Sequence, residues 1–174
     1  CFDQSNLNTN NVANTTASPA FAQDFTSSSH SSNFDSNIVS YGNYYNWYSA
    51  TAGNGIYDKS AGNADGDICP KGWRLPTGGS NGEFNALNQQ MGKGTSATDS
   101  NNWRSFPNNF VYSGRWYGSS ADNRGNRGYY WSSTAISNSG SYYLYLNSSY
   151  VSPGTGDNNK DYGYSIRCTV SADT

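Results

Sequence analysis

The sequence predicts an α+β domain built from short strands, one clear helix and long loops, and closed by a disulfide. Short aromatic runs alternate with Gly, Asn and Asp turns after residue 38, which is typical of many short strands. Residues 82–92 have the apolar spacing of a helix. Cys69 and Cys168 bracket much of the aromatic body of the chain. At 174 residues, the chain fits one domain with an additional tail.

The composition indicates that the core is built from rings rather than aliphatic side chains. Only 34% of the residues are hydrophobic, but 16% are aromatic, and the net charge of -2 is too low to keep the chain disordered by repulsion. A buried ring removes a large area from water, and Tyr or Trp can still satisfy its own polar atom. We expect Trp47, Trp73 and Trp131 to lie in this core.

Two classes of partner are excluded by the distribution of residues. Lys and Arg are scattered and balanced by acids, so no basic stripe for nucleic acid is encoded. No apolar run approaches the roughly 18 residues that a transmembrane segment needs.

The elements follow in order along the chain. Residues 38–50 form a strand-rich stretch, and a tight loop at 62–67 leads into 68–77. The helix over 82–92 is capped by Ser80 or Asn81, presents Phe84, Leu87 and Met91 on one face and ends at Gly92. Strands are predicted at 128–137, 141–152 and 162–170, with turns at 137–140 and 153–159. Alternation in the second of these strands places Tyr142, Leu144 and Leu146 on the core face, opposite Tyr143, Tyr145 and Asn147.

The cysteines indicate an oxidising compartment. The sequence has no CxxC pair and no His near a cysteine, so a zinc site is not expected. Cys69 and Cys168 are instead expected to form a disulfide of an extracellular or cell-surface protein, with two buried free thiols as the alternative. Cys1 is the odd cysteine. It is expected to carry a lipid anchor or to bond to another subunit, with a plain fragment end as the alternative.

Residues 1–38 form an Asn/Ser/Thr-rich tail that differs from the domain at 39–174. Such a composition buries too little apolar surface to fold alone, which is typical of an anchor or stalk. Segments such as 12–22 could instead pair with an exposed sheet edge, in their own domain or in a neighbouring subunit.

Four blocks carry a family resemblance, in order: YGNYYNWYSATAG (Tyr41–Gly53), CPKGWRLPT (Cys69–Thr77), GYYWSSTA (Gly128–Ala135) and GYSIRC (Gly163–Cys168). They resemble the Fibrobacter succinogenes major paralogous domain over roughly residues 40–170. The resemblance implies a C-type-lectin-like fold, export and surface display, and no established catalysis. Within the blocks, we expect Arg74 and Arg167 to donate to backbone carbonyls, and Gly72 and Gly163 to adopt turn geometries that a side chain would block.

Little in the sequence indicates catalysis. The sole histidine, His30, lies in the Ser-rich tail and is not expected to act as a catalytic base, so we expect that the protein is not an enzyme. Asn63, Asp65 and Asp67 alternate around Gly66 and predict a Ca²⁺ site, with a solvated turn as the alternative. No other cofactor is expected. The acidic segment 157–161, which contains Lys160, has the pattern of a plain loop.

A binding surface is the remaining candidate site. One aromatic cluster comprises Tyr112, Trp116 and Tyr117, and a second comprises Tyr143, Tyr145 and Tyr150. Tyr, Ser, Asn and Gly together form the palette of adaptable binding surfaces, and aromatic faces stack on sugar rings. These residues therefore predict a glycan or protein ligand, unless the rings cover a small core or face another subunit.

Three functions follow from these observations. The first is a non-enzymatic, surface-displayed binding or adhesion module. The second is a structural subunit of an extracellular filament or surface assembly whose tail docks on a neighbouring subunit. The third is a variable ligand-binding protein of a diversity-generating retroelement, because residues 138–164 are rich in the residue types that adenine-targeted mutation of Asn codons produces.

Overall fold

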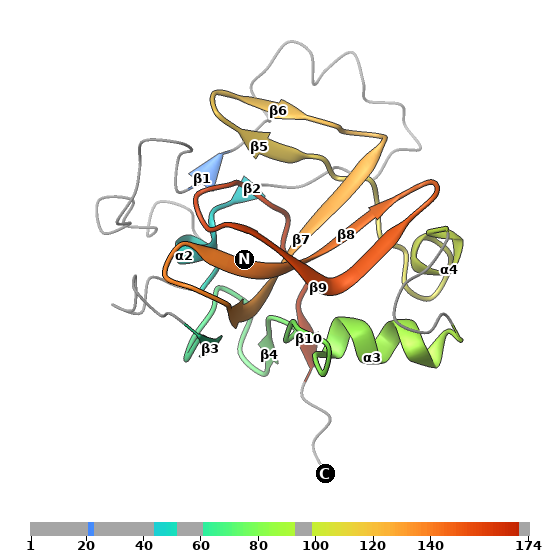
Figure 1. The fold of residues 1–174 in the computed structure, drawn as a ribbon, viewed down its shortest axis with the longest axis horizontal. Helices are drawn as coiled ribbons and strands as arrows, with labels where there is room; N and C mark the ends of the chain where they lie inside the picture. Colours follow the sequence, from blue (N-terminus) through green and yellow to red (C-terminus); the bar gives the residue numbers. More distant parts are fainter. Residues whose placement is uncertain (1–20, 23–43, 52–60, 93–98, 171–174) are drawn as a thin grey trace.

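The computed structural model describes residues 21–22, 44–51, 61–92 and 99–170 (Figure 1). The predictions for Cys1, His30 and most of the tail therefore lie outside the described residues. The described part is mixed α/β and mostly strands, with one long helix. In Figure 1 the hairpin of β5 (Arg115–Tyr117) and β6 (Ser120–Asp122) lies at the top and α3 (Glu83–Gln90) along the bottom, with a four-stranded sheet between them. None of the described helices is long and apolar enough to cross a membrane.

The central sheet is antiparallel, with the strand order β3-β7-β8-β9. Its strands are β3 (Gly62–Asn63), β7 (Arg127–Ala135), β8 (Gly140–Asn147) and β9 (Val151–Asn159). The turn predicted at 153–159 is wrong, because these residues belong to β9. Pro153 and Gly154 are tolerated there since β9 is an edge strand, with a bulge where its register against β8 shifts.

The helices are α2 (Trp47–Ala50), α3 (Glu83–Gln90) and α4 (Asn101–Arg104). The single turn α2 interrupts the stretch that was predicted as strands, because the Asn46 side chain accepts a hydrogen bond from Ser49 N at 2.9 Å and starts a helix. The helix predicted at 82–92 is confirmed as α3, but neither Ser80 nor Asn81 caps it. Thr77 does so from outside the helix, accepting from Glu83 N at 3.0 Å.

Three small ladders complete the structure. β5 (Arg115–Tyr117) pairs with β6 (Ser120–Asp122), and β4 (Trp73–Arg74) pairs with β10 (Thr169–Val170). β1 (Phe21–Ala22), a segment of the tail, pairs antiparallel with β2 (Tyr44–Tyr45).

Both faces of the central sheet are covered. We call the cluster on one face the helix-side core and the cluster on the other the tyrosine-side core. The helix-side core contains Phe84, Trp103, Phe110, Tyr112, Tyr130, Leu144, Leu146 and Val151. The tyrosine-side core contains Trp47, Tyr48, Ala50, Leu75, Tyr129, Trp131, Ala135 and Tyr164. The predicted core face of β8 is thus confirmed for Leu144 and Leu146, while Tyr143 and Tyr145 pack in part against the second core.

Each of the three fully buried tryptophans has a partner for its indole N–H. Trp47 donates to Ser132 O at 2.9 Å, Trp131 to Tyr45 O at 2.8 Å and Trp103 to the Asn88 side chain at 3.2 Å. The stabilisation from burying these rings is therefore not reduced by indole N–H groups that lack an acceptor. Trp73 is the exception to the predicted core, since it is 50% exposed. Among the described strands, β4 pairs with β10, and Trp73 lies opposite Val170, which is also exposed.

Two glycines of the family-like blocks are required for different reasons. Gly72 has φ +84°, which confirms the predicted turn geometry. Gly163 has an ordinary φ, but a Cβ there would lie 2.6 Å from Trp116 Cβ. Gly163 is therefore required by the close approach of β5.

The disulfide between Cys69 and Cys168 is present, with a sequence separation of 99 residues. Cys69 lies shortly before β4, and Cys168 directly precedes β10. The covalent bond and the β4–β10 ladder therefore fasten the same two segments.

We predict that the double variant Cys69→Ser/Cys168→Ser is less stable by about 4–5 kcal/mol, the chain-entropy value for a closed loop of roughly 100 residues. Urea unfolding of both proteins measures the difference. An unchanged midpoint and slope would contradict the prediction.

Candidate binding face

Seven tyrosines form a continuous array of ring contacts, which we call the tyrosine face. They are Tyr117, Tyr129, Tyr143, Tyr145, Tyr150, Tyr162 and Tyr164. Centroid distances of 4.9 Å (Tyr117–Tyr162), 6.4 Å (Tyr162–Tyr164) and 5.1 Å (Tyr164–Tyr129) lead from one exposed end into the array. Distances of 5.3 Å (Tyr129–Tyr145) and 6.2 Å (Tyr145–Tyr150) lead out to the other end.

The central sheet places the middle of this array. Tyr129 in β7 lies opposite Tyr145 in β8, and Trp131 lies opposite Tyr143, so all four rings project from the same face of the sheet. Trp131 then stacks on Tyr164 at 4.2 Å.

Backbone pairing holds the C-terminal segment against the sheet. Tyr164 exchanges two 2.9 Å hydrogen bonds with Tyr45 of β2, and Ser165 N donates to Tyr129 O at 3.0 Å. The same segment then receives β5, because Trp116 and Gly163 exchange hydrogen bonds of 2.7 and 3.0 Å. Tyr117 is thereby placed against Tyr162.

The outer tyrosines are open to solvent, whereas the inner ones support them. Tyr117 is 48% and Tyr150 46% exposed, and Tyr143, Tyr145 and Tyr162 are half-buried. Tyr129 and Tyr164 are buried beneath them. The accessible rings therefore rest on a fixed aromatic layer rather than on mobile loops.

Arg115 connects the rings at one end of the array. Its guanidinium lies 4.7 Å from the centroid of Tyr117, 5.3 Å from that of Tyr129 and 5.8 Å from that of Tyr162. Cation–π attraction favours all three positions. Arg115 Nε donates to Asp122 Oδ1 at 3.0 Å, which fixes the side chain.

Burial disfavours the ionisation of four hydroxyls on this face. It raises the pKa of Tyr164 well above 10.0, and it also raises the pKa values of Tyr129, Tyr143 and Tyr162. Neutral phenols stack and exchange hydrogen bonds, but they do not act as bases near neutral pH. The arrangement is suited to holding a ligand.

Four of the six predicted binding residues lie on this face: Tyr117, Tyr143, Tyr145 and Tyr150. Trp116 is half-buried and alternates to the other side of β5 from Tyr117, with its indole N–H donating to Gly118 O at 3.2 Å. Tyr112 corrects the prediction. It is buried in the helix-side core, shares a 2.7 Å hydrogen bond with Ser100 and is covered by Arg104, so it presents no ring for a ligand.

Sequence reasoning missed Tyr129, Tyr162, Tyr164 and Arg115 as members of the face. The i, i+2 spacing of Tyr129 and Trp131 matches that of Tyr143 and Tyr145, and this signal was available. The strand register that places the two pairs side by side could not be read from the sequence.

Two of the three predicted Ca²⁺ ligands, Asp67 and Asn63, form hydrogen bonds within the described structure. Both carboxylate oxygens of Asp67 accept backbone hydrogen bonds at 2.9 Å, from Cys69 N and Leu75 N. The Asn63 side chain accepts from the Thr134 hydroxyl. No cluster of three or more His, Cys, Asp or Glu side chains suited to a metal occurs among the described residues. Asp67 is therefore assigned to shaping the loop before the disulfide, and the Ca²⁺ site stays a prediction.

Lys160 does not lie in a plain loop, as was predicted for 157–161. Its side chain is fully buried, with Nζ donating to Ser137 O at 2.8 Å and Asn138 O at 3.2 Å and lying 4.4 Å from the centroid of Trp47. The neighbouring Asp161 is also buried, which raises its pKa. The segment therefore anchors the β7–β8 turn to α2.

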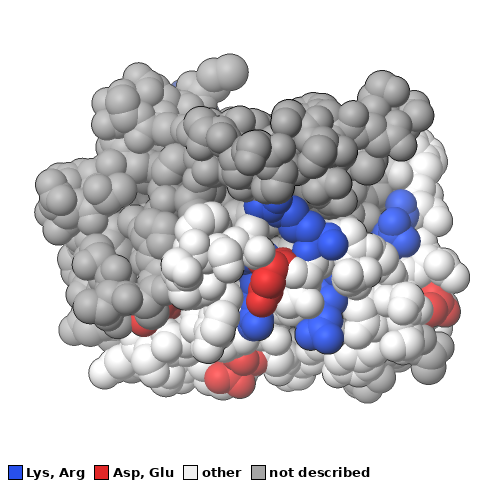
Figure 2. All heavy atoms as spheres, turned by 90° about the horizontal axis from the view of Figure 1, so that it is seen from above, with Lys and Arg blue, Asp and Glu red and all other residues white. Residues whose placement is uncertain are grey.

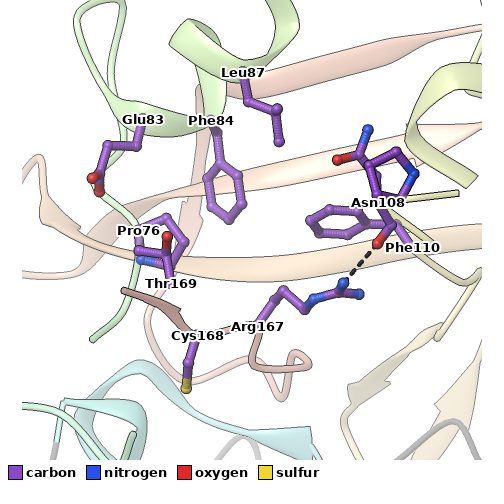
Figure 3. Close-up of a pocket in the computed structure, with 10 residues that line it drawn as sticks. Pro76, Glu83, Phe84, Leu87, Asn108, Phe110, Arg167, Cys168 and Thr169 are labelled. Atoms are coloured by element: carbon purple, nitrogen blue, oxygen red, sulfur yellow. Dashed lines mark hydrogen bonds between the residues drawn. The ribbon is translucent and has the colours of Figure 1, made fainter. Parts of the chain in front are cut away.

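A separate cavity of about 290 Å³ lies beside α3 (Figure 3). Its wall combines apolar side chains with a polar rim: Pro76, Glu83, Phe84, Leu87, Pro107, Asn108, Phe110, Arg167, Cys168 and Thr169. Arg167 donates to Asn108 O at 2.6 Å and lies over Phe110, which confirms its predicted bonding to backbone carbonyls.

The prediction for Arg74 is confirmed in part. Arg74 donates to the backbone carbonyl of Leu75 at 3.3 Å, and it also forms a two-pronged ion pair with Glu83, at 2.5 and 2.6 Å. Glu83 also accepts from Thr77 N. The ion pair between Arg74 and Glu83 thus holds α3 to β4 beside the cavity.

Comparisons of the chain with protein-family models, with curated proteins and with solved structures find no match.

We predict that Glu83→Gln loses stability near neutral pH but not in acid. Hydrogen bonding to Arg74 holds the pKa of Glu83 below its ordinary value of 4.5. The ionised form therefore stabilises the fold above pH 4.5, and this contribution disappears as the pH falls through the folded pKa. Urea midpoints measured from near pH 7 to below about pH 4 should converge for variant and wild type. A difference in urea midpoint that stayed the same at every pH would contradict this prediction. Asp157→Asn, on the exposed part of β9, is the control.

Proposed function

We propose that this protein is a non-enzymatic binding or adhesion module, displayed outside the cell or on its surface, which holds a glycan or protein ligand on the tyrosine face. The observation that carries the proposal is the continuous array from Tyr117 to Tyr150, with exposed rings at its ends and buried rings beneath. Tyr supplies a rigid, amphipathic contact with few rotatable bonds, so little entropy is lost when it binds.

The chemistry of the face supports binding rather than catalysis. Its buried hydroxyls have raised pKa values, and Arg115 is already paired with Asp122. These groups stack and exchange hydrogen bonds without offering a proton acceptor tuned to neutral pH.

We also propose the C-type-lectin-like fold and the family relationship for this domain. Contacts between the four family-like blocks support both. The indole of Trp47 in the first block donates to Ser132 O in the third, and the disulfide joins the second block to the fourth. The disulfide also supports the proposed location, because such bonds persist in oxidising compartments.

A second candidate function is a structural subunit of an extracellular filament or surface assembly. The β1–β2 ladder supports it, since a tail segment forms strand pairing with the domain. Residues 23–43 between them span at most roughly 70 Å when fully extended. The same pairing could therefore be made to a second copy. The diversity-generating retroelement function stays a prediction.

We predict that Tyr117→Ala and Tyr150→Ala each weaken binding of the protein to oligosaccharides on a glycan array. Both rings are about half exposed, so thermal unfolding should stay close to that of the wild type. Trp73→Ala is the matched control, because Trp73 is equally exposed but lies on the β4–β10 ladder. Equal losses for all three variants, or none for the tyrosine variants, would contradict the site.

For the second candidate, we predict that the full chain associates with rising concentration and that deletion of residues 1–38 leaves a monomer. Light scattering after size-exclusion chromatography measures the mass. Full-length Cys1→Ser separates strand pairing from an intersubunit disulfide. If deletion of residues 1–38 left the number of chains in the particle unchanged, the tail would pair only within its own chain.

A further inference from the structure

Two arginines converge on the tyrosine face at its β7 end. Arg127 opens β7 and lies opposite Asn147 of β8, two residues before Tyr129 and therefore on the same side of the sheet. Arg115 approaches the Tyr129 ring from β5, at 5.3 Å from its centroid. Gly114 N donates to Arg127 O at 2.7 Å, so the residue directly before Arg115 is hydrogen-bonded to Arg127 itself. The two arginines therefore lie on neighbouring segments beside Tyr129.

The local charge is positive in a protein whose net charge is -2. Asp122 neutralises Arg115, but no described carboxylate forms an ion pair with Arg127, which is exposed. Figure 2 shows basic side chains gathered on the face seen from the β5–β6 end, with an acidic side chain between them. Two like charges held together without full compensation favour an anion between them.

Hydrogen-bonding groups and rings surround this pair. The Asn147 side chain donates to the Tyr145 hydroxyl at 2.8 Å, directly beside Arg127 in the register. Tyr117 lies next to Arg115 at one end, and Tyr150 lies beyond Tyr145 at the other. A ligand here meets a ring, then a positive charge, then a ring.

Building on the binding function proposed above, we propose that the ligand is an acidic polysaccharide whose uronate carboxylate is held by Arg127 and Arg115 while its sugar rings stack on the exposed tyrosines. A uronate unit carries the charge and the stacking face in one monomer, which matches the alternation of rings and charge along the face. An acidic protein segment would satisfy the arginines, but its carboxylates stand on flexible side chains without a ring to stack. Guanidinium is suited to this contact because its planar fork matches a carboxylate.

The test compares polygalacturonate with its highly methyl-esterified form, which has the same backbone without the charge. Affinity gel electrophoresis and calorimetry measure binding of the full chain. We expect wild type to prefer polygalacturonate, with an affinity that falls as salt is raised. Arg127→Gln should weaken that binding about tenfold and reduce the preference for polygalacturonate over the ester. Arg127→Lys should retain part of the preference, and Arg104→Gln, on α4, is the charge-matched control.

The outcomes separate this inference from the function on which it rests. Equal binding of both polymers, lost in Tyr117→Ala, would overturn the acidic preference and leave the binding face intact. Binding of poly-glutamate with neither polymer bound would overturn the polysaccharide in favour of an acidic protein. Equal losses in Arg127→Gln and Arg104→Gln would show a general charge effect and overturn the site. Binding of none of these probes, together with silence on the glycan array, would count against the proposed function itself.

Discussion

The stack of Trp131 on Tyr164 is the contact on which most of the structure depends. Trp131 is in β7, in the middle of the central sheet, and Tyr164 belongs to the segment that leads to Cys168. Their rings lie 4.2 Å apart and both are fully buried. Because this stack fixes the C-terminal segment on the sheet, β2 and β5 find backbone partners in Tyr164 and Gly163. The tyrosine face and the position of the disulfide both follow from this arrangement.

An aromatic core imposes a requirement that an aliphatic core does not. Every buried indole needs an acceptor, and the chain supplies one each time from a neighbouring element: Ser132 O, Tyr45 O and the Asn88 side chain. These hydrogen bonds are directional, so they fix the positions of α2, β2 and α3 as well as satisfying polar atoms. These hydrogen bonds explain how a chain with few hydrophobic residues adopts one specific fold.

The tyrosine face is an extension of this core. Tyr129 and Tyr164 belong to the core, and the ring contacts of Tyr117 and Tyr150 extend the same aromatic packing to the surface. A surface supported in this way is preorganised, which lowers the entropic cost of binding. The helix side of the sheet lacks this property, because its aromatic rings (Phe84, Trp103, Phe110, Tyr112 and Tyr130) are all buried and none of them continues the core to the surface.

Four features could be predicted from the sequence: the strand-rich class, the long helix, the Cys69–Cys168 pair and the inward direction of Leu144 and Leu146. These features depend on local periodicity and on the number of cysteines, both of which are readable along one chain. Three other features are visible only in the folded protein: Tyr112 is buried while Tyr117 is exposed, Trp73 lies outside the core, and Lys160 lies within it. Each of these depends on which distant segment covers a residue. The register of β7 on β8 and the packing of residues 162–165 against the sheet determine which residues are covered, and neither can be read from the local sequence pattern.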